Sequence, residues 1–309
     1  MRYYKIVVGD RTWESYTGGK NVPGALNVEL DIPVTAYASP FGAGGVSIWG
    51  VSLQDIGQAS DFNGKNITIY AGFQKGLPLA NPGQSGIIVQ GSVFQATGNW
   101  IDVNQNLFFV IQPSTGTNAT PENIILNWKK GTKLADALQT TLSTALPDLT
   151  LDIKISDNLV LAADEYGYYQ TLTQFASYVK IASQNIIGGN YAGVDMTISD
   201  TTIKIYDGST QTSPTQIAFQ DMIGQPTWLN NLTVQTHFAM RADLAVGDYI
   251  KFPAAQTTTN PGSTFPGGPS QKSVFQGVFQ INQMRHVGNF RQPDAESWVT
   301  VVDANSVTA

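Results

Sequence analysis

The sequence predicts a mainly β protein with a small α/β insert. Three observations lead to this fold class. Period-two alternation of apolar and polar residues recurs in short runs near both ends of the chain, turn-forming residues separate these runs, and long helical spacing is confined to the middle. We therefore expect a first β domain at residues 1–112, a small α/β domain at residues 113–190 and a second β domain at residues 191–309. Short strands at close spacing favour a sandwich or a barrel for each β domain.

The first β domain is predicted from apolar or alternating runs that are separated by turns. Asn63-Gly64 is a strong turn signal and precedes one of the alternating runs, and the glycine-rich residues 42–45 precede another. Residues 53–59 have the pattern of one or two helical turns, which fits a small helix within a barrel. The predicted strands lie at residues 5–8, 26–32, 46–51, 66–71, 87–94 and 107–111.

The middle region changes character after the breaker-rich residues 113–121. Residues 133–146 place apolar side chains at every fourth position and Pro147 ends the run, which predicts an amphipathic helix. Residues 149–155 alternate as a strand. Residues 172–181 gather apolar side chains on one side and predict a second helix. These elements together predict the small α/β insert.

The second β domain is predicted from a return to period-two alternation. Residues 196–200 and 202–206 have the pattern of a hairpin within this domain. Residues 257–268 are rich in Thr, Pro and Gly, which predicts a mobile loop. The further predicted strands lie at residues 232–238, 249–252, 275–281 and 297–302.

The low content of charged residues is the unusual feature of the composition. The 309 residues contain 13% Asp, Glu, Lys and Arg, whereas soluble proteins contain roughly 25%. Either much of the surface is covered by other subunits, because interface cores are depleted in charge, or the chain has an ordinary β surface rich in Thr, Asn and Gln. Composition leaves both interpretations open.

Net charge and cysteine content exclude several classes of function. The formal charge is −6 and the sequence has no basic run, which argues against a protein that binds nucleic acid through its phosphates. The absence of cysteine excludes disulfides, thiolate catalysis and Cys-ligated metal sites. No apolar run reaches the roughly 7–15 residues of an export signal or the about 20 residues of a membrane helix. We therefore expect a soluble protein without an export signal and without direct membrane insertion.

No residue is predicted to be catalytic, cofactor-binding or metal-binding, and no interface residue is assigned. The two histidines, His237 and His286, lie in or near predicted strands and are interpreted as structural. The pattern Ser-x-x-Lys at residues 177–180 and the Ser-Asp-Asn at residues 156–158 occur in the wrong order for penicillin-recognising enzymes. No nucleophile elbow, HExxH or phosphate-binding glycine motif is present. We expect no cofactor and no enzymatic activity.

Two further residue types are candidates for binding or catalytic groups. A glycosidase needs two carboxylates across a cleft, but spacing does not bring any two glutamates together. The glutamates are Glu14, Glu29, Glu122, Glu165 and Glu296. The tryptophans in or beside predicted strands are interpreted as core or subunit-interface anchors, rather than as a platform for sugars. They are Trp49, Trp100, Trp228 and Trp298.

Blocks of residues in both β domains carry a resemblance to a known family. The blocks lie at residues 48–52, 63–80, 86–100, 223–228, 240–248, 285–291 and 297–301. They span most of the chain, and they are similar to baseplate hub proteins of tailed bacteriophages. The resemblance implies two tail-tube-like β domains for each chain.

The resemblance also implies a function. Such hubs form homotrimeric rings in which two tube-like domains per chain imitate six-fold symmetry. One face of the ring accepts the hexameric tail tube, the other seats the trimeric central spike, and DNA passes through the lumen. Other baseplate proteins are further expected partners. We expect synthesis in the host cytoplasm, assembly into the virion tail and, on the resemblance alone, a contractile tail. An acidic lumen wall would repel DNA phosphates.

Two alternatives remain open from the sequence. The first is a carbohydrate-binding receptor-recognition component of a tail, which predicts exposed aromatic side chains along a groove. The second is a hydrolase of cell-wall polysaccharide, although the chain has no spare length for a fused lysozyme domain.

Overall fold

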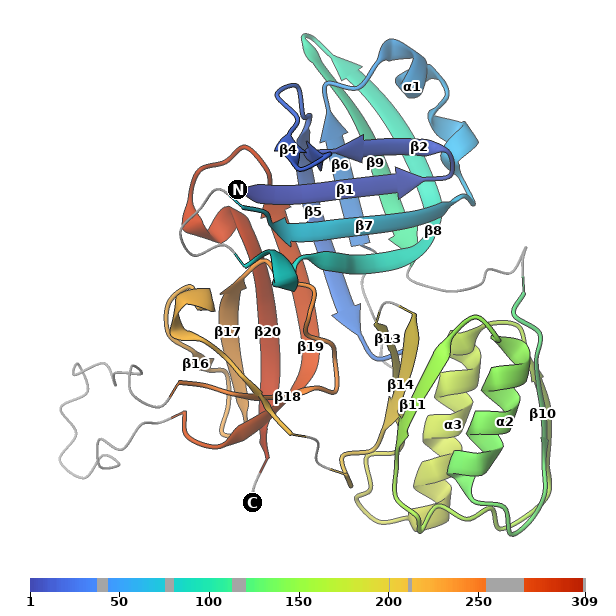
Figure 1. Ribbon diagram of the computed structural model, residues 1–309. Helices are drawn as coiled ribbons and strands as arrows, with labels where there is room; N and C mark the ends of the chain where they lie inside the picture. Colours follow the sequence, from blue (N-terminus) through green and yellow to red (C-terminus); the bar gives the residue numbers. More distant parts are fainter. Residues whose placement is uncertain are drawn as a thin grey trace, which may run out of the picture.

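Figure 1 shows the chain as a computed structural model, which describes residues 1–37, 44–75, 81–112, 121–199, 201–210, 213–253 and 275–307. Two β regions lie one above the other in this view, and an α/β region lies beside the lower one. The mainly β fold is confirmed. The loop predicted at residues 257–268 lies outside the described residues, as does most of the breaker-rich link before residue 121.

Most of the strands belong to one large sheet. Its order is β16-β17-β20-β19-β5-β6-β9-β8-β7-β1-β2, and β18, which carries β15, branches from β19. The strands are β1 (Arg2–Val8), β2 (Arg11–Glu14), β5 (Asn27–Thr35), β6 (Gly44–Trp49), β7 (Asn66–Phe73), β8 (Gly86–Ile101), β9 (Asn104–Gln112), β15 (Thr215–Gln216), β16 (Thr227–Trp228), β17 (Thr233–Ala239), β18 (Tyr249–Lys251), β19 (Val278–Asn289) and β20 (Trp298–Val307).

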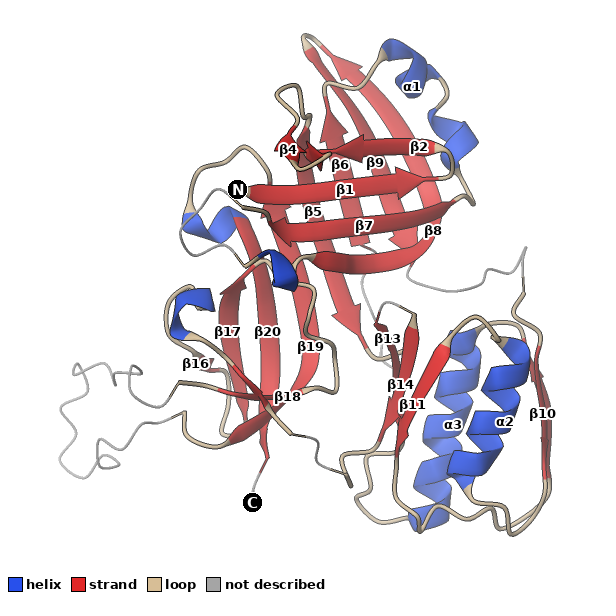
Figure 2. Cartoon of the chain, in the orientation of Figure 1, coloured by secondary structure: helices blue, strands red, loops and turns tan. Residues whose placement is uncertain are grey.

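The first β region folds its part of the sheet into two layers around a core. β8 connects the layers, because its first half pairs with β7, its second half pairs with β9, and a bulge between Val93 and Gln95 bends it. In Figure 2, β1, β2 and β7 cross over β5, β6 and β9. The fully buried side chains of this core include Tyr4, Ile6, Ile48, Ile69 and Phe109.

Short elements complete the β regions. The predicted helical turns after β6 are confirmed as α1 (Leu53–Gly57) and η1 (Ala59–Phe62), and Ser52 caps α1 by accepting a hydrogen bond from the Asp55 amide at 3.1 Å. The Asp55 carboxylate also lies 3.1 Å from Arg11, which attaches α1 to β2. The remaining short elements are β3 (Tyr16–Thr17), β4 (Lys20–Asn21), η2 (Pro82–Gln84), η3 (Phe219–Asp221) and η4 (Ala295–Ser297).

The two β regions are joined by a seam inside the large sheet. β5 of the first region pairs antiparallel with β19 of the second, from Glu29 opposite Asn289 to Thr35 opposite Gln283. The indole of Trp298 crosses the seam and donates to the Gly72 carbonyl at 2.9 Å. Gly288 is required beneath this indole, because a Cβ there would lie 2.6 Å from the Trp298 ring.

A buried ionic cluster also joins the two β regions. The Arg241 side chain is 3% exposed, and its guanidinium binds Asp243 through two hydrogen bonds of 2.7 and 2.6 Å. Asp221 lies 3.2 Å from the same guanidinium and accepts a bond of 2.8 Å from Gln84 of the first region. The cluster therefore ties η2 to the second region through groups that are largely removed from water.

The α/β region contains two helices between two small sheets. The helices are α2 (Leu134–Ala145) and α3 (Leu172–Ile187). On one side lie β11 (Thr150–Lys154), β14 (Thr202–Tyr206) and β13 (Asp195–Ser199), and on the other lie β10 (Ile124–Trp128) and β12 (Glu165–Tyr169). Figure 2 shows this layering. Both predicted helices are present, and α3 extends beyond residue 181 because nothing breaks it before Gly188, whose φ is 73°.

The hairpin β13–β14 pairs with a strand outside the region in which the sequence placed it. The sequence pattern placed it in the second β domain, but β14 pairs in parallel with β11 of the α/β region. Met196, Ile203 and Ile205 are fully buried in the core of that region. Period-two alternation predicts a strand but not its neighbour, and we therefore propose that the α/β region runs on through β14.

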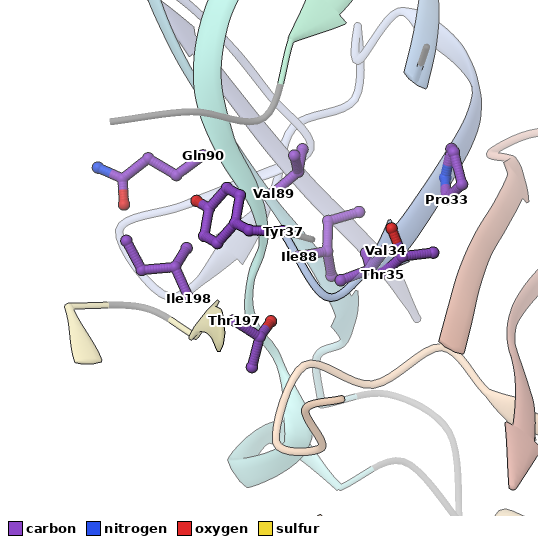
Figure 3. A pocket seen from close by; sticks show the side chains of 9 residues that line it. All are labelled: Pro33, Val34, Thr35, Tyr37, Ile88, Val89, Gln90, Thr197 and Ile198. Atoms are coloured by element: carbon purple, nitrogen blue, oxygen red, sulfur yellow. The ribbon is translucent and has the colours of Figure 1, made fainter. Parts of the chain in front are cut away.

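A small cavity lies where the α/β region meets the first β region (Figure 3). The Tyr37 ring is buried in the core of the α/β region, and the Tyr37 amide donates to the Met196 carbonyl at 2.8 Å. Tyr37 therefore anchors the segment after β5 to β13. The cavity of about 50 Å³ is lined by Pro33, Val34, Thr35, Tyr37, Ile88, Val89, Gln90, Thr197 and Ile198.

Candidate functional site

The candidate functional site is the open face of the large sheet, on β9, β6, β5, β19, β20 and β17. Along β5, Val28, Leu30 and Ile32 are buried in the core, so that the alternate residues Glu29 and Asp31 point to the other face. The same alternation holds on the neighbouring strands. One face of the sheet is therefore filled with core side chains, and the other carries polar groups from both β regions.

Two adjoining hollows run across this face. The first, of about 560 Å³, extends from Phe108 on β9 to Arg285 on β19. The second, of about 380 Å³, extends from Thr35 on β5 to Gln235 and His237 on β17. Pro33 and Arg285 line both hollows, so the hollows form one groove across the seam.

An aromatic ring packs closely against a glycine on this face. The Phe108 ring on β9 packs against Gly45 of β6, where an added Cβ would be 3.0 Å from the ring. A larger residue at position 45 would push the ring into the groove. The position of the Phe108 ring at this end of the groove therefore depends on Gly45.

Carboxylates dominate the charge of the open face. The strands β5, β6, β8, β9, β17, β19 and β20 contain four residues of the types Asp, Glu, Lys and Arg, and these are Glu29, Asp31, Arg285 and Asp303. All four lie on the open face, where Glu29, Asp31 and Arg285 line the first hollow and Asp303 lines the second. Three carboxylates therefore accompany one guanidinium.

Each of these carboxylates is held by a donor on a neighbouring strand. The Arg285 guanidinium binds Asp31 through two hydrogen bonds, at 2.6 Å from Nε and 2.5 Å from Nη2. The hydrogen bond to Asp31 raises the pKa of Arg285. Glu29 accepts from the Asn289 amide at 2.9 Å, which makes a second contact across the seam.

Asp303 lies at the other end of the groove and is held by two amides. Gln235 on β17 donates to one carboxylate oxygen at 2.9 Å, and Gln283 on β19 donates to the other at 2.6 Å. The acidic side chains of the open face are therefore fixed in position by amide and guanidinium donors from neighbouring strands.

The two histidines occupy different environments. His237 lines the second hollow on the open face. His286 is fully enclosed, and its Nδ1 lies 3.0 Å from the Thr300 hydroxyl. Burial lowers the pKa of His286 to about 4, so the imidazole is neutral at pH 7.

The serine and lysine of the Ser-x-x-Lys pattern have other partners. Ser177 donates to the Thr173 carbonyl of its own helix at 2.9 Å, and Lys180 binds Asp195 at 2.8 Å. The second of these contacts connects α3 to β13. Both lie within the α/β region and do not form a catalytic pair.

The glutamates lie in separate places. Glu29 is on the open face, Glu165 accepts from the Tyr178 hydroxyl at 2.8 Å, and Glu122 accepts from the Leu172 amide at the start of α3. Burial raises the pKa of Glu122 to about 7. Sequence spacing gave no sign of this shift, because it depends on how the link before β10 packs against α3.

The tryptophans differ in exposure. Trp298 is buried at the seam, and Trp228 stacks on Phe275 with 5.7 Å between ring centroids. Trp100 is exposed at the tip of the β8–β9 hairpin. Within the described ranges, no cluster of three or more His, Asp or Glu side chains could hold a metal ion. Nor does any helix in this part of the chain have the length and apolar content needed to cross a bilayer.

Comparison with known proteins identifies the fold. Neither the protein-family models nor the curated protein sequences contain a match to the chain. Among solved structures, the 43 kDa tail protein of prophage MuSo2 from Shewanella oneidensis matches with a TM-score of 0.51 and 7% identity, over 98% of this chain and 96% of that one. The chain has the fold of a phage tail protein. The resemblance found in the sequence is thus confirmed at the level of the fold.

Two further structures are similar to the tail-protein fold of this chain. The tail protein from Neisseria meningitidis MC58 has a TM-score of 0.49 at 10% identity, over 99% of this chain and 96% of that one. The E. coli c3393 protein, a component of the type VI secretion system with structural similarity to T4 tail proteins gp27 and gp5, has a TM-score of 0.46 at 10% identity. That match covers 92% of this chain and 73% of c3393.

Proposed function

We propose that the chain is a structural hub of a phage tail baseplate. Three copies form a ring with pseudo-six-fold symmetry, which joins the hexameric tail tube to the trimeric central spike and lets DNA pass through its lumen. The observation that carries the proposal is the continuous sheet, because one open polar face spans both β regions of the chain. The proposed location is the baseplate of the virion, after synthesis in the host cytoplasm.

The seam between β5 and β19 supports a ring wall. Because the two β regions share ladder hydrogen bonds, each chain contributes one unbroken stretch of wall, and three chains contribute six β regions. A ring of this kind needs interfaces that close on themselves. The sparse charge of the chain is consistent with such interfaces, since their cores are depleted in charged residues.

The charge of the open face supports its assignment to the lumen. Glu29, Asp31 and Asp303 outnumber Arg285 on this face. A wall with excess negative charge repels DNA phosphates and keeps passing DNA from adhering. We propose that this face, rather than the outer face of β1 and β7, lines the channel.

Exposed apolar tips at opposite ends of the sheet support two docking faces. The β8–β9 hairpin ends in Trp100, Ile101 and Val103, each more than half exposed. The β16–β17 hairpin ends near Leu229 and Leu232, which are also more than half exposed.

Strand register supports placing these tips at opposite ends. The β8–β9 tip is beyond the end at which Asn27 begins β5, since Asn27, Trp49 and Asn106 lie in one row. The β16–β17 tip is beyond the other end, since Thr233 lies opposite Asn305 near the close of β20. We propose that the tube binds at one end and the spike at the other.

Native mass spectrometry tests the ring. The purified chain should give a species of three times the 33.3 kDa of one chain. After addition of the tail tube protein and the spike protein, the mass should rise by that of the partners bound to this trimer. A ring should be visible by electron microscopy of the same sample. A chain that stays monomeric in the presence of both partners would contradict the proposal.

A second candidate function is glycan binding by the α/β region. Tyr166 and Tyr168 are exposed on the same face of β12, next to the exposed Ile125 of β10. Their hydroxyls are fixed by Asp164 at 3.0 Å and by Asn123 at 2.7 Å, which leaves a preformed aromatic surface. Binding of host polysaccharide that is lost in a variant with both tyrosines changed to Ala would favour this function. Clearing in a peptidoglycan zymogram would instead favour the hydrolase.

A further inference from the structure

We propose that Asp31 is a positioning residue that masks Arg285 and so keeps the open face from binding polyanions. Arg285 is the one Lys or Arg on the described strands of this face. Without a carboxylate bound to its guanidinium, Arg285 would bind phosphate groups at a fixed position on this face. The biological reason for the mask, free passage of DNA, rests on the proposed function; the masking itself is a property of the face of a single chain.

The geometry of the pair supports masking. Both hydrogen bonds, from Nε and from Nη2, go to the two oxygens of one carboxylate. This planar, two-bonded arrangement is the one with which arginine also binds phosphate. Asp31 therefore occupies the edge of the guanidinium that is best suited to a phosphate group and cancels its charge.

The other acids of the face are not equivalent to Asp31. Glu29 is held by the amide of Asn289, and Asp303 by the amides of two glutamines. Neutralising Glu29 or Asp303 would remove a negative charge but would release no cation. Loss of Asp31 would remove a negative charge and would also release the Arg285 guanidinium. This difference distinguishes masking of a cation from general repulsion of DNA by negative charge.

A purely structural role for the pair predicts something else. The side chains of Arg285 and Asp31 are 58% and 52% exposed. An exposed ion pair adds only a small amount to the stability of a protein, and the two-bonded geometry places this pair at the upper end of the range for such pairs. If the pair had only a structural role, its removal would lower the melting temperature and leave DNA binding unchanged. Masking predicts the reverse: a small change in stability and a clear increase in DNA affinity.

The experiment measures binding of a short fluorescent DNA duplex to the full chain by anisotropy, at several salt concentrations. For Asp31→Asn we expect affinity about tenfold above wild type at low salt, since one charge-assisted hydrogen bond to phosphate has roughly this effect. The slope of log affinity against log salt should steepen by about 0.9 for each additional phosphate that the protein neutralises. The matched control Glu29→Gln should give a much smaller increase.

Two variants test whether the increase acts through Arg285. The double variant Asp31→Asn with Arg285→Gln should return to the level of wild type, and Asp31→Glu should keep DNA excluded. If Asp31→Asn binds no better than Glu29→Gln, or if Arg285→Gln weakens binding by the wild-type chain, the proposal is wrong.

A third variant keeps the test decisive if Asp31→Asn fails to fold. Gln95→Arg places an unmasked cation on an exposed position of β8, opposite Val110 on the same face. It should bind DNA more tightly than wild type, whose arginine is masked. If Gln95→Arg also fails to bind, a free cation does not make the face adhesive, and no mask is needed.

The assay separates this inference from the proposed function. It uses the chain with DNA alone and needs neither tube nor spike. A ring without an effect of Asp31→Asn would refute masking and leave the hub intact. If Asp31→Asn increases DNA affinity but the chain never forms a ring, masking is supported and the hub proposal is refuted.

Discussion

The two junctions of the molecule are built differently. At the seam, the β regions share a ladder from Glu29 to Thr35, the buried indole of Trp298 and the cluster around Arg241. The α/β region is attached by the Tyr37 amide and ring, by the Tyr206 ring, which packs against the core of the second β region, and by Lys204, which binds Asp248 of that region at 2.6 Å. The seam therefore makes the β regions one cooperative unit, whereas the α/β region has its own core and is attached through few groups.

Two buried groups, one at the seam and one inside the α/β region, respond to pH in opposite directions. His286 at the seam is held neutral by burial, with a pKa lowered to about 4. Burial at the start of α3 favours the protonated form of Glu122 and raises its pKa to about 7. The contrast suggests four experiments, taken here from the largest expected effect to the smallest.

Removal of Arg241 should have the largest effect. In Arg241→Ala, Asp221 is left buried without its cation, and loss of one partner of a buried pair costs about 3–5 kcal/mol. Denaturant unfolding should show this loss, and hydrogen exchange should increase in both β regions together. The matched variant at the other junction, Lys204→Ala, should cost about 1 kcal/mol and raise exchange only in the α/β region. Exchange confined to the second β region in Arg241→Ala would contradict a single cooperative unit.

The next effect is the acid sensitivity of the seam. The folded pKa of His286, about 4, lies below the 6.5 of an unfolded histidine, so the unfolded chain binds more protons between these values. Stability should therefore fall as pH drops from 6.5 to 4, by about 3 kcal/mol at most. His286→Gln should remove this part of the pH dependence. The measurement is urea unfolding at a series of pH values, and an unchanged slope in the variant would disprove the assignment.

Glu122 inside the α/β region should show a smaller effect of the opposite sign. The folded pKa of Glu122, about 7, lies above its ordinary 4.5, so the native state binds more protons in this window. Stability contributed by the protonated carboxyl is lost as pH rises from 4.5 to 7. Because the side chain is partly exposed, we expect about 1–2 kcal/mol rather than the full linkage value.

Glu122→Gln tests this assignment in the same series of unfolding curves. The variant should be more stable than wild type at pH 8 and similar to it at pH 4. The pH ranges in which Glu122 and His286 change the stability of the protein overlap between pH 4.5 and 6.5. Their opposite effects on stability therefore partly cancel in wild type. A Glu122→Gln variant that is less stable at pH 8 would show that the carboxylate is accommodated there.

The smallest effect on stability should come from the hairpin tips, which belong to neither junction. Two double variants test the tips: Trp100→Ser with Ile101→Ser, and Leu229→Ser with Leu232→Ser. Each should change the free energy of unfolding by no more than about 0.5 kcal/mol. In a pull-down, each double variant should lose binding to either the tube protein or the spike protein and keep binding to the other. Loss of both partners from one pair would contradict docking at opposite ends.

Local patterns in the sequence predicted most elements but few of their partners. α2 was predicted almost to the residue because Leu134, Leu138 and Leu142 face one core and Pro147 ends the run. The hairpin β13–β14 was predicted as a hairpin within the second β domain, whereas β14 pairs with β11 of the α/β region. Alternation reports which face of a strand is buried, and it carries no information about whether β11 or a β-region strand lies alongside.

The candidate site could be predicted only in part for the same reason. The alternation of Glu29 and Asp31 with buried residues marks one open strand, and Arg285 stands in another. That these strands are neighbours follows from a pairing across some 254 positions of the sequence, which no local pattern reports. The pKa shifts of Glu122 and His286 depend on burial by distant elements, so sequence alone could not predict them.

The central position of β5 has a consequence for synthesis. Until β19 has left the ribosome, one edge of β5 has no partner, and unpaired edges promote aggregation. The residues along that edge include Glu29, Asp31 and Pro33, and charge and proline are the features that protect strand edges. We therefore expect the residues that later face the groove to keep nascent chains apart as well, during the slow, long-range closure of the sheet.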